Sequence, residues 1–121
     1  YKNKNKVFNT PAFNFDEVVT LPANSTLLSS NSINKVMGVS FKVGISSVWG
    51  IQYHPEISYE KMISLIHFRT ERLLNNKAFK DQNEIDSHVK IIEDEKKVSE
   101  LNARMRELEN WLKFIGSKLN V

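Results

Sequence analysis

Residues 48–56 read Val48-Trp49-Gly50-Ile51-Gln52-Tyr53-His54-Pro55-Glu56, and no other segment of the chain is as informative. The apolar first part is typical of a buried strand, which would deliver a histidine to its C-terminal end. Side chains two positions apart in an extended segment point to the same side, so His54 and Glu56 are expected to lie together. Pro55 between them fixes its own φ and favours an extended conformation at the residue before it.

This placement suits acid–base chemistry. A carboxylate at Glu56 can accept a hydrogen bond from one imidazole nitrogen of His54, which leaves the other nitrogen facing outward as a base. Open α/β folds also bind their ligands at the carboxyl ends of strands. The His-x-Glu spacing alone is common, and such a histidine can equally cap a helix or hydrogen-bond within a loop. A metal site would need a third ligand, and neither His67 nor His88 stands at a companion spacing.

The first half of the chain predicts strands and turns. Residues 1–57 hold all three prolines and three of the four glycines, which are residues that interrupt helices. Strands are expected over residues 25–30, 36–43 and 47–53, with turns at Asn31-Ser32 and at Gly44. Short consecutive strands with tight connections favour an antiparallel or mixed part of a sheet.

The second half predicts two or three helices. Ser58 is the expected N-cap of a helix over residues 59–75, and a lysine- and asparagine-rich break follows at residues 75–80. Asp81 and Glu84 have the spacing of a capping box, which begins the next helix. Whether residues 81–119 form one helix or two is left open by the sequence.

A heptad-like seam marks the end of the chain, at Val98, Leu101, Met105, Leu108, Leu112, Ile115 and Leu119. We expect this seam to be buried, either against the protein's own sheet or against the helix at residues 81–92. The alternative is that the C-terminal helix pairs with another helix or with its own copy, which would make a homodimer.

Composition excludes several classes of protein. The chain has no cysteine, so it holds no disulfide, thiolate metal site or cysteine nucleophile. The net charge is only +3, and the 12 basic and 10 acidic residues from Lys61 onward are mixed along the predicted helices, which argues against a nucleic-acid partner. No apolar run is long enough to cross a membrane, and no secretory h-region follows the first lysines, so a cytoplasmic protein is expected. Lys2, Lys4 and Lys6 are expected on a solvated strand edge or a frayed terminus.

The segment Trp49–Glu56 closely resembles the signature that ends class I (triad-type) glutamine amidotransferase domains, where an aromatic-Gly-aliphatic-Gln-aromatic strand leads into His-Pro-Glu. Residues 15–22 and 25–31 look like the family's Asp-x-Val-x-x-Leu-Pro stretch and the strand after it. The nearest likeness is to stand-alone domains similar to the glutaminase part of GMP synthase. Many members carry a histidine where this chain has Asn14, a position outside the triad.

The resemblance implies an α/β fold: the C-terminal part of a flavodoxin-like amidotransferase domain over residues 1–75, with a helical extension over residues 76–121. It implies that His54 and Glu56 are two members of a Cys-His-Glu triad that hydrolyses glutamine, without metal or cofactor. The cysteine would come from an N-terminal half that is absent from this sequence, and a synthetase domain or subunit would take the ammonia. The rival interpretation is a helical interaction module or a degenerate amidotransferase-like protein without activity.

Overall fold

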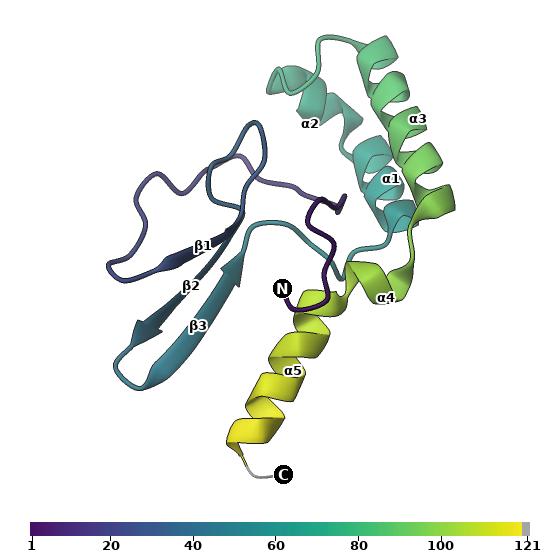
Figure 1. Ribbon diagram of the computed structural model, residues 1–121. Helices are drawn as coiled ribbons and strands as arrows, with labels where there is room; N and C mark the ends of the chain where they lie inside the picture. Colours follow the sequence, from purple (N-terminus) through teal and green to yellow (C-terminus); the bar gives the residue numbers. More distant parts are fainter. Residues whose placement is uncertain (120–121) are drawn as a thin grey trace. The chain divides into compact units, whose positions relative to one another are not determined.

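The fold was analysed in a computed structural model that describes residues 1–119 (Figure 1). The chain forms two compact units, the first made of Tyr1 with residues 12–54 and the second of residues 2–11 with residues 55–121. The first unit contains the strands and the second the helices, so the protein has a mixed α and β fold, which is compatible with the α/β class expected from the sequence. The flavodoxin-like architecture stays a prediction. The chain passes between the two units three times, after Tyr1, after Pro11 and after His54. The predicted boundary at residue 75 concerns similarity to an amidotransferase domain and stays a prediction.

The first unit is a three-stranded antiparallel sheet in the order β1-β2-β3, with β1 at Thr26–Ser29, β2 at Gly38–Val43 and β3 at Ser46–Ile51. The three predicted strands are confirmed, each slightly shorter than expected. Gly44 and Ile45 make the two-residue hairpin loop, and Gly44 has a φ of +58°, which glycine adopts without steric cost. A bulge in β1 between Leu27 and Ser29 shifts its pairing with β2 by one residue.

The connection from β1 to β2 is closed by the side chain of Asn31. Its Oδ1 accepts hydrogen bonds from the backbone N–H groups of Ile33 at 2.9 Å and Asn34 at 2.6 Å. Asparagine favours such turns because its short side chain can replace a backbone acceptor. The turn predicted at Asn31-Ser32 is therefore confirmed, and it leads to the buried residues Val36 and Met37, which directly precede β2.

The second unit is built around two long helices that pack together, α1 at Tyr59–Phe68 and α3 at Gln82–Val98. Figure 1 shows α1 lying along α3. Their facing apolar residues form the core, namely Tyr59, Met62 and Ile66 from α1 and Ile85, Val89 and Ile92 from α3. Their spacing follows the 3.6-residue period of a helix, so each helix presents one apolar face to the other.

Both predicted helix starts are confirmed by their caps. Ser58 Oγ accepts from the Lys61 N–H at 3.1 Å, and Asp81 Oδ1 accepts from the Glu84 N–H at 2.9 Å. The return bond of the capping box differs from the standard motif, because the Glu84 carboxylate accepts from the N–H of Lys80, one residue before the cap. The break predicted between these helices at residues 75–80 is also present.

The helix expected over residues 59–75 is divided in two at Arg69, where α1 ends and α2 (Thr70–Asn75) begins. Arg69 has a φ of −102° and a ψ of 13°, away from helical values. The Thr70 hydroxyl donates to the Ile66 carbonyl at 3.0 Å, an i−4 bond that bends helices. No glycine or proline stands at this break. Because the apolar residues keep their helical spacing across it, the sequence predicts one continuous helix.

The C-terminal seam is divided among three helices. Helix α3 ends at Val98, Ser99 and Glu100 are extended, α4 covers Leu101–Arg104, and α5 covers Arg106–Lys118. Within residues 1–119, α5 makes no contact with α3, so the expectation that the seam packs on the helix at residues 81–92 is wrong. Four seam residues are more than 60 % exposed, namely Val98, Leu101, Leu112 and Leu119. Pairing with a second copy stays a prediction.

The packing of α1 on α3 predicts that Ile85→Ala lowers the free energy of unfolding by about 2–5 kcal/mol, because the fully buried isoleucine would leave a cavity. Denaturant unfolding followed by far-UV circular dichroism measures the change. The matched control is Ile91→Ala on the same helix, where the side chain is 64 % exposed and the change should stay within about 0.5 kcal/mol. Equal losses at the two positions would contradict the observed helix packing.

Candidate active site

The strand that leads to His54 is anchored at its end. Tyr53, 3 % exposed, pairs with Ala12 in an isolated bridge, and its hydroxyl lies 2.6 Å from the hydroxyl of Tyr1. The Tyr1 hydroxyl in turn lies 2.9 Å from Ser29 Oγ. A Cβ at Gly38 would approach the Tyr1 hydroxyl and Ser29 Oγ to under 3.0 Å, so any larger residue there would displace these side chains. This hydroxyl cluster (Tyr1, Ser29 and Tyr53) fixes the backbone one residue before the histidine.

The predicted site residues follow directly. His54 is half-buried at the end of the first unit, Pro55 is fully buried, and Glu56 is exposed in the turn that precedes the N-cap of α1. Because His54 and Glu56 belong to different compact units, the predicted hydrogen bond between imidazole and carboxylate stays a prediction. The local structure does agree with the sequence argument in one respect, since a strand ends just before the histidine and a helix starts just after the glutamate.

Arg104 contacts the middle of the His-Pro-Glu turn. It is the last residue of α4, and its Nε donates to the Pro55 carbonyl oxygen at 2.8 Å. Its guanidinium carbon also lies 5.7 Å from the ring centre of Tyr59, the first residue of α1. Charge-assisted hydrogen bonds are roughly twice as strong as neutral ones, so this contact ties the turn to α4. No local pattern in the sequence distinguishes Arg104 from the other charged residues of the helices.

Tyr59 lies in a low-polarity environment beside this arginine. Burial raises the pKa of its phenol, Ser99 opposes that shift, Glu95 adds to it and Arg104 opposes it. The buried Tyr59 hydroxyl makes no hydrogen bond with the described residues. The phenol therefore stays neutral at physiological pH and serves as a packing surface for the guanidinium.

Lys4 holds the N-terminal segment against α4 and α5. Its Nζ donates to the carbonyls of Ala103 and Arg104, both at 3.0 Å, and lies 2.7 Å from Glu107 Oε2. The Lys4 and Glu107 side chains are only 3 % and 6 % exposed. The angles between them are not those of a hydrogen bond, so this contact is an ion pair. The expectation that Lys4 is solvated is wrong, whereas Lys2 and Lys6 are exposed as predicted.

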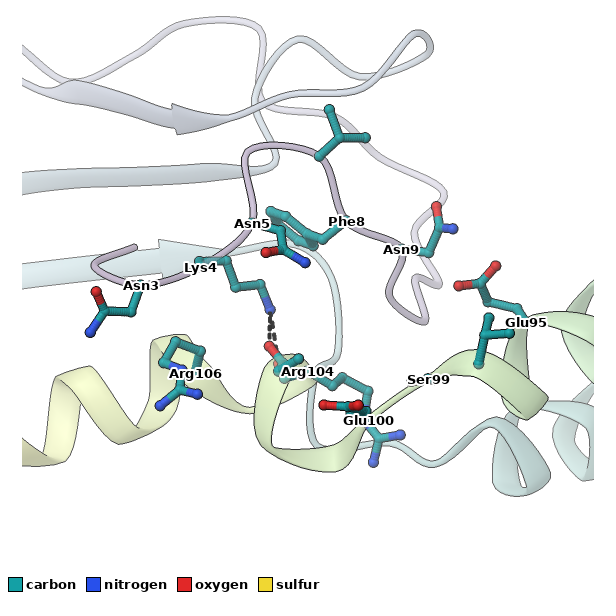
Figure 2. A pocket seen from close by; sticks show the side chains of 13 residues that line it. Asn3, Lys4, Asn5, Phe8, Asn9, Glu95, Ser99, Glu100, Arg104 and Arg106 are labelled. Carbon is teal, nitrogen blue, oxygen red and sulfur yellow. Dashed lines mark hydrogen bonds between the residues drawn. The ribbon is translucent and has the colours of Figure 1, made fainter.

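A cleft of about 420 Å³ opens beside this cluster, within the second unit. Figure 2 shows the side chains that line it, with hydrogen bonds from Lys4 to the backbone of α4. Its lining is mostly polar and includes side chains of both charges. The basic ones are Lys4, Arg104 and Arg106, and the acidic ones are Glu95 and Glu100. The Lys4 ammonium is fully engaged by protein groups, so it adds little attraction for a ligand.

Over residues 1–119, no three histidine or acidic side chains gather closely enough to hold a metal ion. None of the helices in that range is long and apolar enough to cross a membrane.

Over 85 residues the chain is 28% identical to a gamma-glutamyl-L-1-hydroxyisopropylamide hydrolase of a Pseudomonas species. The aligned stretch covers 70% of this chain and 28% of that hydrolase, so the chain spans less than a third of its relative's length. No protein-family profile matches the chain. No solved structure matches it. The chain is therefore distantly similar to a hydrolase of a γ-glutamyl amide.

The Lys4 ion pair predicts that Lys4→Met destabilises the second unit by about 3 kcal/mol, because Glu107 would remain buried without its cation. The matched control is Lys6→Met, which removes the same charge from an exposed position and should change stability by no more than about 0.5 kcal/mol. Denaturant unfolding measures both.

A second substitution separates the ion pair from simple packing. Adding Glu107→Leu to Lys4→Met should recover part of the lost stability, because it removes the uncompensated carboxylate. Additive losses in the double variant would contradict a coupled pair.

Proposed function

We propose that this chain supplies the histidine and the glutamate of a class I amidotransferase-like hydrolase, which acts on the side-chain amide of a γ-glutamyl group. The observation that carries the proposal is the Trp49–Glu56 signature, which ends in His54-Pro55-Glu56. The distant similarity to a γ-glutamyl amide hydrolase also supports it. The chain has no cysteine, so the nucleophile comes from a segment outside these 121 residues, in the N-terminal part of a flavodoxin-like domain.

The reaction needs one base that works in both directions. The cysteine thiolate attacks the amide carbon of the substrate, His54 holds the cysteine's proton, and the amide C–N bond breaks as His54 delivers that proton to the departing nitrogen. Water, activated by His54, then hydrolyses the thioester and releases glutamate. Glu56 orients the imidazole and stabilises its charged form. The half-buried position of His54 suits this role, because it limits solvent at the base while leaving it accessible.

Glutamine is the proposed substrate, and a synthetase domain or subunit in the cytoplasm would receive its ammonia. A second candidate follows from the relative's name: a hydrolase that cleaves larger γ-glutamyl amides and transfers nothing. The two differ in leaving group, ammonia in the first and a primary amine in the second. A non-catalytic interaction module is the remaining alternative, and the exposed seam residues Leu112 and Leu119 favour it. Coding sequence that precedes Tyr1 and contains a Gly-x-Cys-x-Gly segment would support the enzyme over the module.

In a protein that joins this chain to its cysteine-bearing segment, His54→Ala should lower the release of ammonia from glutamine by at least about 10²–10⁴-fold, because both proton transfers lose their carrier. The matched control is His67→Ala, an exposed histidine on α1, which should retain full activity. The 121-residue chain alone should release none. Turnover like that of the wild type after His54→Ala would contradict the proposal.

Glu56→Gln should lower the same activity less than His54→Ala, because the imidazole remains but loses its charged partner. The two losses should not add, since the residues act as one unit. Glu93→Gln, which removes an exposed carboxylate from α3, is the control. Assays with glutamine and with an N-alkyl γ-glutamyl amide, each followed by glutamate release, distinguish the two candidate substrates.

A further inference from the structure

The helical extension reaches the His-Pro-Glu turn through one hydrogen bond. Arg104 belongs to residues 76–121, the region for which the sequence offered no role, and its Nε donates to the Pro55 carbonyl at 2.8 Å. That carbonyl belongs to the peptide group that joins Pro55 to Glu56. Because a peptide group is planar, fixing its oxygen also fixes the direction in which the backbone enters Glu56.

The Pro55 carbonyl has few other partners available. Pro55 is fully buried, so water reaches its oxygen poorly, and the residue lies before the N-cap of α1, outside the ladder of helical hydrogen bonds. A buried carbonyl without a donor is costly, and backbone groups in such positions are normally paired. Without the Arg104 donor, the Pro55 carbonyl would recover a hydrogen bond only if this peptide group rotated toward another donor. Glu56 would move with it.

Arg104 is itself held at both ends. Lys4 binds the carbonyls of Ala103 and Arg104, and Lys4 is paired in turn with the buried Glu107. At the other end of the side chain, the guanidinium lies over the ring of Tyr59, which is 5 % exposed. The position of the Nε donor is therefore restrained by a fixed backbone and by a packed guanidinium. A group that positions another residue needs such restraint.

We infer that Arg104 is a positioning residue for the reaction proposed above, which holds the Pro55–Glu56 peptide so that the Glu56 carboxylate is presented in one orientation. The inference rests on the proposed function. Arg104 need not touch the substrate, since it acts through the backbone of the turn. The helical extension is then part of the catalytic apparatus.

The test compares Arg104→Met, Arg104→Lys and Arg106→Met in the protein that contains the cysteine segment. Arg104→Met should lower kcat by about 10- to 100-fold while KM changes by less than about threefold, as expected for misplacement of a group that does not bind substrate. Arg104→Lys keeps a charged donor and should recover part of kcat. Arg106→Met removes an equal charge two residues away, where the arginine pairs with Glu109, and should retain kcat within about threefold.

A second measurement separates positioning from folding and from the proposed function. In the 121-residue chain, the amide ¹⁵N and ¹H shifts of Glu56 report directly on the Pro55–Glu56 peptide, and they should move in Arg104→Met but stay in place in Arg106→Met. Unchanged Glu56 shifts, or a kcat per folded molecule that Arg104→Met leaves intact, would overturn the inference. A wild-type protein that releases neither ammonia nor amine would overturn the proposed function, while the Glu56 shifts would still show whether Arg104 holds the turn.

Discussion

The buried ammonium of Lys4 is the constraint on which the second unit depends. A charge removed from water must be matched by protein groups, and here two helix-end carbonyls, a carboxylate and the ring of Phe8, 4.3 Å from the ammonium, do so. Carbonyls at a helix C-terminus carry partial negative charge, which makes the end of α4 a suitable partner for a cation. These contacts join residues that are about one hundred positions apart in the chain, so they hold the N-terminal segment of the second unit on α4. The position of α4, and with it Arg104, follows from this one group.

Local signals in the sequence predicted most of the secondary structure. Ser58 and Asp81 are caps whose side chains bond the first turn of a helix, and Gly44 adopts a conformation that glycine favours, so each could be recognised from its neighbours alone. The breaks at Arg69 and at Ser99-Glu100 could not, because the apolar period continues across both and no glycine or proline stands there. The same periodicity led to a seam predicted as one buried face, whereas the structure distributes its residues over three helices.

The candidate site divides in the same way. His54 and Glu56 could be identified from the sequence, because a strand pattern, a proline and two chemically suitable residues occur together within nine positions. Lys4, Arg104 and Glu107 could not. Alternating lysine and asparagine is typical of solvated chain, and an arginine among mixed charges on a helix is typical of an exposed face. These residues are important because they lie close together in the folded chain. A local stretch of sequence cannot show this, since Lys4 is about one hundred positions from the other two.

The His-Pro-Glu turn is held on each side by the unit to which that side belongs. Before His54, the hydroxyl cluster fixes Tyr53, and the Gln52 N–H donates to the Met37 carbonyl at 2.9 Å. After it, Arg104 holds the Pro55 carbonyl and Ser58 caps α1. A base and its orienting carboxylate work only within a narrow range of geometry, so their backbones must have few alternative conformations. The peptide bond that links His54 to Pro55 is planar, and the ring of Pro55 restrains its φ, so the backbone that joins the two residues has few rotatable bonds.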